Sequence, residues 1–341
     1  MKEVLVGKDE AELIECMESL GQAPYRGKQL VKAIYQNFIR EIDGLTNFSK
    51  QLREDLSKNY QISPNSVLTR TQSADKTTKY LIKLEDENTI ECVNIFHPNH
   101  NTACLSTQVG CNVGCPFCAT GLSGFERNLT TAEIVDQYIL MQKESKNNIS
   151  QIVFMGMGEP LLNYYEVMNA LFILNNEIGV GMRHISLSTV GIIKQIEKLK
   201  EEKLQINLAV SLHSAVEETR DILVPINKTN PLNDLLRVCK EYGDFTKRRV
   251  TFEYVMLKGV NDSNEDAEIL AKKMKGMLAH VNLIPYNTTS SEDYESSSMN
   301  RIRDFQEILD ENNIPVTIRV SRGSSANSAC GQLRATKGSD F

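Results

Sequence analysis

The amino-acid sequence predicts an α/β protein whose parallel sheet closes, or partly closes, into a barrel. From residue 102 onward, short strand-like apolar runs alternate with longer segments of helical periodicity, which is typical of parallel sheets with crossover helices. Residues 1–62 carry only helical patterns, which predicts a small accessory domain. Between these parts, strand-like runs at 77–84 and 89–96 flank the polar segment 85–88, as expected for a linking β-hairpin.

The composition fits a division into three parts. The chain has 341 residues, of which 41% are hydrophobic, enough for a large core and a small second domain. We expect a helical domain at residues 1–65, a β-hairpin linker at 66–100 and an α/β core at 101–341. No apolar run reaches membrane-spanning length and no signal-peptide pattern is visible, so we expect a cytoplasmic protein without membrane contact. The net charge of −6 argues against non-specific coating of nucleic acid, although a local basic surface can still bind RNA.

The helical domain is predicted from apolar residues at helical spacing. One helix is expected over residues 10–20, and a second opens after Pro24. Arg26, Lys28 and Lys32 lie on the early turns of the second helix, where they form either a solvated polar face or contacts to an RNA backbone. The apolar positions are Leu13, Ile14 and Met17 in the first helix, Leu30, Val31, Ile34 and Phe38 in the second, and Leu45, Phe48, Leu52 and Leu56 further on.

The α/β core is predicted from alternating runs. The expected strands are 103–108, 151–155, 184–188, 206–211, 250–256, 280–284 and 315–320. The expected helices include 131–145, 164–178, 231–242, 264–276 and 298–312, the first of which starts at the capping sequence Thr130–Glu133.

Polar residues and glycines gather where these strands end. In parallel α/β barrels, functional residues lie at the carboxyl ends of the strands, so we expect the site there. The candidates are Gly156, Gly158 and Glu159 after the second strand, Ser188 and Thr189 at the end of the third, Ser211 and His213 at the fourth, and Asn287 after the sixth.

Three cysteines follow the first strand of the core. Cys111, Cys115 and Cys118 have the spacing C-x3-C-x2-C, and three thiolates can hold three irons of a four-iron, four-sulfur cluster and leave the fourth iron open. Gly110 and Gly114 let such a loop fold tightly. A zinc site with the upstream His97 and His100 is an alternative. A ferredoxin-type cluster would need C-x2-C-x2-C and a fourth cysteine, which this loop lacks.

The cysteine loop and five further motifs carry a family resemblance. The spacing C-x3-C-x-F-C resembles the radical S-adenosylmethionine superfamily, whose members have six-unit partial barrels. Over about residues 20–335 the chain is similar to the dual-specificity RNA adenine-carbon-2 methyltransferases, the RlmN family. The motifs are CLSTQVGCNVGCPFCATG at 104–121, MGMGEP at 155–160, LSTVG at 187–191, SLH at 211–213, VNLIPYN at 281–287 and ACGQL at 329–333.

The resemblance implies a set of catalytic residues. Cys330 would carry the methyl group before its transfer, Cys104 would be its partner thiol, and Glu91 would be the proton acceptor. A protein–RNA adduct would be resolved to a Cys104–Cys330 disulfide. One 4Fe-4S cluster and two molecules of S-adenosylmethionine would serve each turnover. The implied cofactor contacts are Gly158, Glu159, Ser188, Ser211, Leu212, His213 and Asn287.

The resemblance also implies substrates and partners. The substrates would be a specific adenosine of 23S rRNA and the adenosine 3′ to the anticodon in tRNAs, with a flavodoxin-type or similar electron donor and a monomeric enzyme. Two alternatives remain open. One is the sister group (Cfr), which methylates carbon 8 of adenine in 23S rRNA and confers antibiotic resistance: Gly158–Pro160 favours the carbon-2 group, whereas Cys118–Gly121 leans slightly toward the sister group. The other is a non-enzymatic RNA-binding protein with a structural metal.

Cys330 lies in a basic C-terminal segment. Its arginine neighbours favour a reactive thiolate over an inert core thiol. This segment and Lys247–Arg249 could bind phosphates or simply be solvated. The run 323–328 departs from the acidic run that relatives often have before ACGQL, which puts the fit of this loop to its substrate in question. The positive charges of the segment are Arg319, Arg322, Arg334 and Lys337, against Asp340.

Overall fold

A ten-stranded sheet is the centre of the molecule. The computed structural model describes residues 2–289, 293–319, 322–323 and 326–334. In this part of the chain the strand order is β14-β13-β12-β11-β10-β9-β6-β5-β4-β3, with parallel pairing from β14 to β6. The parallel strands are β6 (Asn101–Cys104), β9 (Ile149–Phe154), β10 (Ile185–Thr189), β11 (Asn207–Ser211), β12 (Val250–Met256), β13 (Ala279–Pro285) and β14 (Val316–Ile318). The predicted α/β fold with a partly closed parallel sheet is confirmed.

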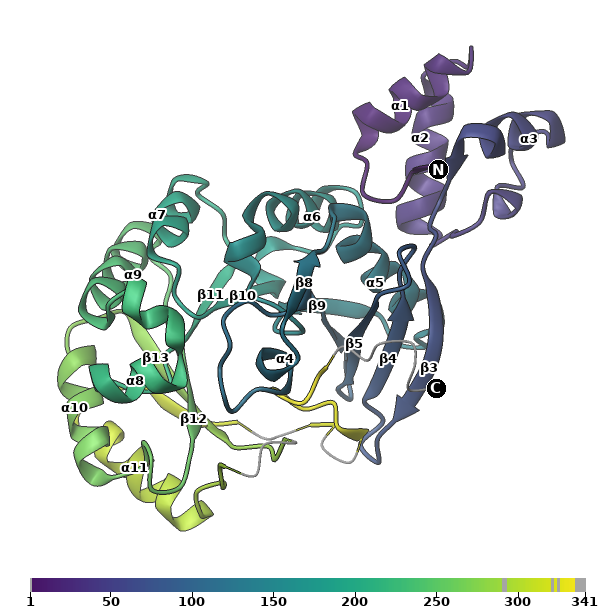
Figure 1. Cartoon of the computed structure of the whole chain (residues 1–341). Helices are drawn as coiled ribbons and strands as arrows, with labels where there is room; N and C mark the ends of the chain where they lie inside the picture. Colours follow the sequence, from purple (N-terminus) through teal and green to yellow (C-terminus); the bar gives the residue numbers. More distant parts are fainter. Residues whose placement is uncertain (1, 290–292, 320–321, 324–325, 335–341) are drawn as a thin grey trace.

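Helices cover the outer, convex side of the parallel strands (Figure 1). The predicted helices are present with shifts of a few residues at their ends, and α7 and α8 were not predicted. Capping boxes at Thr130 and Ser263 fix the starts of α5 and α10. No helix of the described residues is long and apolar enough to cross a membrane. The helices are α5 (Thr131–Glu144), α6 (Tyr164–Asn176), α7 (Ile193–Glu201), α8 (Glu217–Leu223), α9 (Leu232–Thr246), α10 (Asn264–Met274) and α11 (Met299–Glu311).

Three antiparallel strands extend the sheet beyond β6. The two predicted strands of the hairpin are β4 (Thr78–Lys83) and β5 (Thr89–Phe96), and a further strand, β3 (Ser66–Gln72), precedes them. β5 pairs with β6, with Val93 opposite Cys104. The region expected to be a hairpin linker is therefore part of the main sheet, because β5 pairs with β6, the first strand of the core, along the length of β6.

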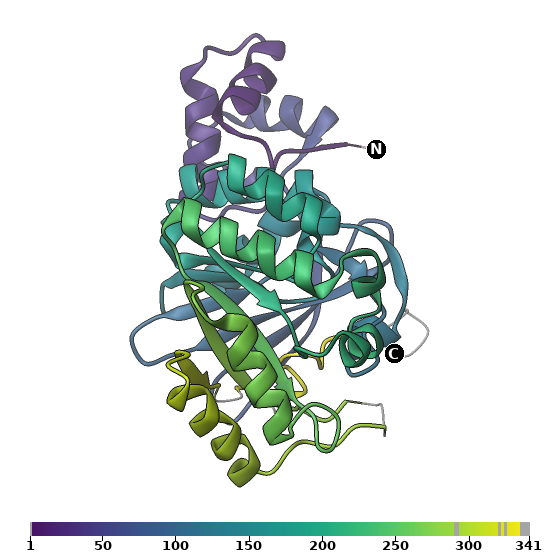
Figure 2. The same cartoon turned by 90° about the vertical axis from the view of Figure 1, so that its left-hand side faces the viewer.

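The N-terminal helices lie at one end of the core (Figures 1 and 2). The Arg40 guanidinium donates to the buried Asp136 carboxylate of α5 at 2.9 and 3.0 Å, which ties this region to the core. The elements are β1 (Glu3–Val4), α1 (Glu10–Ser19), α2 (Tyr25–Val31) continued by a π-helical turn at Lys32–Gln36, α3 (Lys50–Asn59) and β2 (Tyr60–Gln61), with β1 and β2 forming a small parallel sheet. Short 3-10 turns occur at 42–44, 160–163, 182–184 and 225–229.

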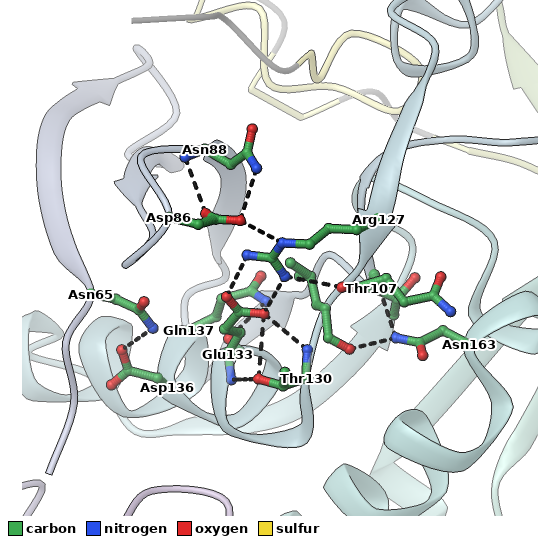
Figure 3. A network of polar contacts seen from close by, with 12 residues as sticks. Asn65, Asp86, Asn88, Thr107, Arg127, Thr130, Glu133, Asp136, Gln137 and Asn163 are labelled. Carbon is green, nitrogen blue, oxygen red and sulfur yellow. Dashed lines mark hydrogen bonds and ion pairs between the residues drawn. The ribbon is translucent and has the colours of Figure 1, made fainter. Parts of the chain in front are cut away.

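A polar network supports the segment that leads into the cysteine loop (Figure 3). Arg127 pairs with Asp86 at the β4–β5 turn and with Glu133 in the first turn of α5. Gln137 exchanges two hydrogen bonds with the backbone of Ser106. The loop elements β7 (Gln108–Gly110), α4 (Ala119–Leu122) and β8 (Phe125–Asn128) are thereby held against α5 and the antiparallel strands.

Candidate active site

A cavity opens at the carboxyl ends of the parallel strands. Its volume is about 170 Å³, and its wall combines the ends of β9 to β13 with the cysteine loop. The position agrees with the one expected from the alternation of strands and helices. The predicted residues on its wall are Cys111, Cys115, Cys118, Gly158, Glu159, Ser188, Ser211, His213, Asn287 and Cys330.

The cysteine loop is closed by backbone contacts that require glycine. Gly110 ends β7 with a φ of 78°, and a Cβ atom there would collide with the carbonyl of Gly124. The Cys111 N–H donates to that same carbonyl at 2.7 Å, so the loop closes across β7 and β8. Gly114, with a φ of 73°, turns the chain between Cys111 and Cys115. The three thiols are thereby collected on one side of the cavity.

The surroundings of the three thiols fit a metal-bound thiolate. The backbone N–H groups of Val113 and Gly114 lower the pKa of Cys111, and those of Thr120 and Gly121 lower the pKa of Cys118, so each lies close to a thiol. In the protein alone, burial raises the pKa of each thiol, to about 12 for Cys111. Iron displaces such protons, and N–H groups aimed at sulfur stabilise the thiolates that result. The residues present therefore fit a cluster held by three cysteines.

The zinc alternative finds no matching ligand set. Within the described ranges, no group of three or more His, Cys, Asp or Glu side chains is placed to hold a single metal ion. His97 and His100 stack on each other with ring centroids 4.6 Å apart, and neither lines the cavity of the cysteines. Three thiols that line one cavity can hold three irons of a cluster.

Glu159 is a buried carboxyl group beside the cluster site. Its carboxylate accepts the backbone N–H groups of Leu161 at 2.9 Å and Val190 at 2.7 Å, and its own N–H donates to Gln108 at 2.9 Å. Burial raises its pKa to about 7 in spite of these donors. Gly158 has a φ of 98°, and a Cβ atom there would collide with Gln108. A ligand ammonium group at this position would be a suitable partner for the carboxylate.

His213 is held as a neutral donor. Its Nδ1 accepts the Val255 N–H at 3.1 Å, which leaves Nε2 as the protonated nitrogen. Burial, and secondarily the charge of Arg220, lowers its pKa to about 3. Ser188 and Ser211 lie on neighbouring strands with their Oγ atoms 3.5 Å apart. They therefore offer hydroxyl groups to one ligand.

Leu212 does not join these residues on the cavity wall. Its side chain is fully buried, its N–H donates to the carbonyl of Glu253 at 3.0 Å, and its carbonyl accepts from Arg220 at 3.1 Å. A contact to the cofactor through Leu212 would need one of these bonds to open.

The segment that carries Cys330 is bound to the cavity rim. The Gly331 carbonyl accepts the Ala119 N–H at 2.8 Å, and the Leu333 carbonyl accepts the Thr120 hydroxyl at 2.5 Å. The Asn287 amide donates to the carbonyl of Cys330 at 3.2 Å. These bonds place Cys330 beside the cysteine loop, where the segment passes α4 in Figure 1.

Cys104 lies on the other side of Cys330. It ends β6 and lines a second cavity together with Cys330. Burial and the nearby sulfur of Cys330 raise the pKa of Cys104 to about 12, although Arg319 opposes the shift. Both thiols are free. The disulfide that the resemblance implies between them as a product of turnover is therefore not present in this structure.

Glu91 lies on β5 and is buried, where an exposed strand carboxylate would be the ordinary expectation. Lys79 pairs with its carboxylate at 2.8 Å, and the backbone N–H of Arg334 donates to it at 3.0 Å. It lines neither of the two cavities. The structure therefore places Glu91 under the C-terminal segment and does not bring it onto the wall with Cys104 and Cys330.

Several polar residues of the site carry no sequence motif. Arg220 is fully buried and donates to the carbonyls of Val190 and Leu212 and to Asn227. Glu253 lines the cavity beside Arg319, with its Oε2 3.8 Å from the guanidinium. In the sequence, Arg220 resembles an ordinary surface residue of a helix and Glu253 an ordinary strand residue. Only the three-dimensional structure shows that both belong to the site.

The basic residues that were predicted either to bind phosphates or to be solvated have different surroundings in the structure. Arg248 donates to the Ile206 carbonyl and the Asn207 side chain, so it serves the fold. Arg319 and Arg322 line the second cavity. Lys337 and Asp340 lie outside the described residues.

Comparisons with known proteins agree with this geometry. The family described as "Radical SAM superfamily" matches residues 105–271, and the "Ribosomal RNA large subunit methyltransferase N-terminal domain" matches residues 4–62. A "Probable dual-specificity RNA methyltransferase RlmN" of Trichodesmium erythraeum is 47% identical over 333 residues, covering 98% of this chain and 96% of that protein. Another of the same description, from Pseudothermotoga lettingae, is 45% identical and covers 94% of each chain.

A solved structure extends the likeness to the fold. The crystal structure of a radical SAM methyltransferase from Sphaerobacter thermophilus superposes with a TM-score of 0.94 at 41% identity, covering 97% of this chain and 99% of that one. Membership of the superfamily implies a 4Fe-4S cluster and S-adenosylmethionine. By sequence along nearly its whole length, and by its fold, the chain belongs to the RlmN family of radical SAM RNA methyltransferases.

Proposed function

We propose that this protein methylates carbon 2 of adenosine in RNA, with a specific adenosine of 23S rRNA and the adenosine 3′ to the anticodon of tRNAs as substrates. The observation that carries the proposal is the position of Cys330. Cys330 lines the cavity that the three cluster cysteines line, and it lines a second cavity together with Cys104. A thiol that carries the methyl group has to lie beside the cluster and cofactor site, which is where Cys330 lies.

The target atom explains why a thiol carrier is required. Carbon 2 of adenine lies between two ring nitrogens and is electron-poor, so it cannot attack a sulfonium methyl group as a nucleophile. A radical centred on a methyl group that Cys330 already holds can add to it instead. Covalent catalysis of this kind divides one inaccessible step into feasible ones.

The first cavity would bind the cofactors. Cys111, Cys115 and Cys118 would hold the cluster, which when bound supplies the electron for reductive cleavage of S-adenosylmethionine. Glu159 would receive the ammonium group of the methionine moiety, and Gly158 allows its close approach. Ser188, Ser211, His213 and Asn287 would bind the ribose, carboxylate and adenine groups, with Leu212 contributing at most through its backbone.

Cys330, Cys104 and Glu91 would carry the later steps. Cys330 takes a methyl group from a first molecule of S-adenosylmethionine, and a second molecule serves its activation. Cys104 then resolves the protein–RNA adduct. Glu91 is the proposed proton acceptor, and its carboxylate becomes available once the bonds from Lys79 and the Arg334 N–H are released. We further propose a monomer that acts in the cytoplasm with a flavodoxin-type electron donor.

The test is the modified base itself. RNA from a strain that lacks the gene should contain no 2-methyladenosine at the two target sites, by nucleoside mass spectrometry. A plasmid copy of the wild type should restore it, and a Cys330→Ala copy should not. If the plasmid copy restored 8-methyladenosine instead, the protein would have the carbon-8 activity of the sister group. An unchanged nucleoside profile would refute the proposed function.

A further inference from the structure

Arg220 on α8 carries a positive charge in the interior of the protein. It is the largest fully buried side chain of the described residues, and no other lysine or arginine among them is buried. A guanidinium group stays charged at neutral pH, and buried charges are normally paired with an opposite charge because an unpaired one is costly. The surroundings of Arg220 therefore have to be searched for an anion.

The hydrogen bonds of Arg220 all go to neutral acceptors. Its Nε donates to the Leu212 carbonyl at 3.1 Å, and its Nη2 donates to the Val190 carbonyl at 2.6 Å. Its Nη1 donates to the side-chain oxygen of Asn227. Among the described residues, Arg220 therefore has acceptors for its N–H groups but no carboxylate as a direct partner.

Asn227 separates Arg220 from the two carboxylates of this region. Its side-chain nitrogen donates to Glu217 and to Asp221, at 2.7 Å in each case. Both carboxylates belong to half-buried residues that solvent reaches, and solvent screens their charge. A neutral amide thus stands where a salt bridge could have formed, and the charge of Arg220 remains available to the groups on its other side.

On that other side lie the cluster cavity and the cysteine loop. Val190 and Ser211 line the cavity, and their carbonyls accept from Arg220, which does not line the cavity itself. Leu223, at the end of α8, packs in one apolar cluster with Cys115. Burial lowers the pKa of Arg220 to about 10, and the sulfur of Cys115 opposes this shift more than any other nearby group does. Arg220 is therefore a cation directly behind the wall of the cluster site.

We propose that Arg220 is the buried counter-charge of the cluster that Cys111, Cys115 and Cys118 would hold, and that it raises the reduction potential of this cluster. The inference rests on the proposed role of these cysteines. Reduction moves one electron from the donor to the cluster, so the net charge of the cluster becomes more negative by one. A fixed positive charge in a low-dielectric interior stabilises the reduced state more than the oxidised one. Arg220 lines neither cavity, so it acts through its charge and through the backbone that it positions.

The opposite end of β11 offers a matched arginine. Arg248 donates to the Ile206 carbonyl at 3.1 Å and to the side-chain oxygen of Asn207, at the start of the strand. Arg220 binds carbonyls at its end, at Ser211 and beyond. Both arginines bind a carbonyl and an amide oxygen, but only Arg220 lies behind the cluster cavity. Loss of hydrogen bonds should affect both positions, whereas an effect on the potential should be confined to Arg220.

The experiment is a redox titration of the purified, cluster-loaded protein without RNA or S-adenosylmethionine, followed by electron paramagnetic resonance. Arg220→Met removes the charge and keeps a long side chain, and Arg220→Lys keeps the charge. Asn227→Asp keeps Arg220 and gives it a carboxylate partner. Arg248→Met is the control. Iron content and circular dichroism show for each variant that the cluster is loaded and the fold intact.

The expected result is a shift that follows the charge. Arg220→Met should lower the equilibrium constant for reduction about tenfold or more, which for one electron is a fall of about 59 mV in midpoint potential per factor of ten. Asn227→Asp should shift the potential in the same direction, because its carboxylate neutralises the guanidinium group. Arg220→Lys and Arg248→Met should keep a potential close to that of the wild type.

Two results would overturn the inference. One is an unchanged potential in Arg220→Met with its cluster fully loaded. The other is an equal shift in Arg220→Lys, since lost hydrogen bonds would then explain the effect. If Arg220→Met does not fold or does not retain iron, Asn227→Asp decides, and an unchanged potential in that variant would overturn the inference in the same way. A wild type that binds no iron–sulfur cluster would instead refute the proposed function itself.

Discussion

Among single residues, Cys104 and Cys330 have similar chemistry and different surroundings. Cys104 is buried at a strand end, and Cys330 is half-buried on a segment between two cavities. If Cys330 carries the methyl group, Cys330→Ala should give neither methylated RNA nor an adduct. Cys104→Ala should still add its methyl group to the base and then fail to resolve, so it should copurify with covalently bound RNA. Denaturing gels with and without ribonuclease measure this difference.

The double variant is the control for that comparison and should carry no RNA. The two-cysteine mechanism would be wrong if Cys104→Ala turned over normally. It would be equally wrong if both single variants were inert and free of RNA.

Glu159 should give the protein without ligands a measurable pH dependence of stability. Its pKa is raised from 4.5 to about 7 by burial, so the folded state binds a proton that the unfolded state has lost between these values. The free energy of unfolding should therefore fall as pH rises from about 4.5 to about 7, by on the order of 3 kcal/mol. Urea denaturation of the wild type and of Glu159→Gln across this range measures the effect. The substitution should flatten the profile, and the same change at the exposed Glu126 should not.

Residues that belong to sequence motifs could be predicted as site residues. Residues that only the fold brings to the site could not. The cysteine spacing and the polar residues at the strand ends predicted many of the residues on the cavity wall. The resemblance implied a contact at Leu212, yet Ser211 and His213 line the cavity while the side chain of Leu212 packs into the core. Arg220 was missed, since burial of a charge at that turn depends on the carbonyl groups of Val190 and Leu212, which follow two different strands.

Among the structural elements, the antiparallel strands β3 to β5 position the C-terminal segment. Asp75 in the β3–β4 turn accepts the Gly323 N–H at 3.0 Å, and Lys79 on β4 donates to the Asn327 carbonyl at 3.2 Å. Glu91 on β5 accepts the N–H of Arg334. The antiparallel strands β3 to β5 therefore hold in place the segment that carries Cys330.

Lys79→Met tests this support. It leaves the buried Glu91 carboxylate without its cation, and removal of one partner of a buried pair costs about 3–5 kcal/mol. We expect a lower free energy of unfolding and faster amide hydrogen exchange in residues 326–334. Lys83→Met is the matched control, since Lys83 lies on the same strand and, among the described residues, pairs only with the exposed Glu87. Equal effects of the two substitutions would contradict the supporting role.

The strand β3 shows why part of this support could not be predicted. Apart from a half-buried Val67, its residues are exposed, so no alternation of buried and exposed positions marks it in the sequence. β4 and β5 have the buried apolar residues that made their prediction possible. Local sequence patterns do not show which strands pair, so the pairing of β5 with β6 could not be predicted from them.

Across the whole molecule, the N-terminal helices are the second surface expected to meet RNA. Arg26 stacks over the rings of Tyr25 and Phe48, and Tyr25 itself is 54% exposed. Lys28 lies 3.6 Å from Glu10, with both side chains largely exposed. Neutralising Arg26, Lys28 and Lys32 should weaken RNA binding and reduce its log–log salt slope by about one unit for each phosphate group that the variant no longer neutralises.

Filter-binding assays at several salt concentrations measure the slope. Methylation of Cys330 without RNA should stay the same in this triple variant. Replacing Lys50, Arg53 and Lys58 of α3 by glutamine removes an equal charge from another helix of the same region and serves as the control. An unchanged affinity for RNA would mean that the α2 face is only solvated.

The segment that carries Cys330 is anchored almost entirely through its main chain. The anchoring atoms are the N–H groups of Gly323 and Arg334 and the carbonyls of Asn327, Cys330, Gly331 and Leu333. Two side chains near its end add to this attachment, since the Gln332 amide donates to the Thr288 carbonyl at 2.9 Å and Leu333 packs in the hydrophobic core. The departure of residues 323–328 from the acidic run of relatives removes none of the main-chain anchors. Insertions, deletions or a proline at a donor position would break them. This stretch can therefore diverge in sequence among relatives while its length and its course stay the same.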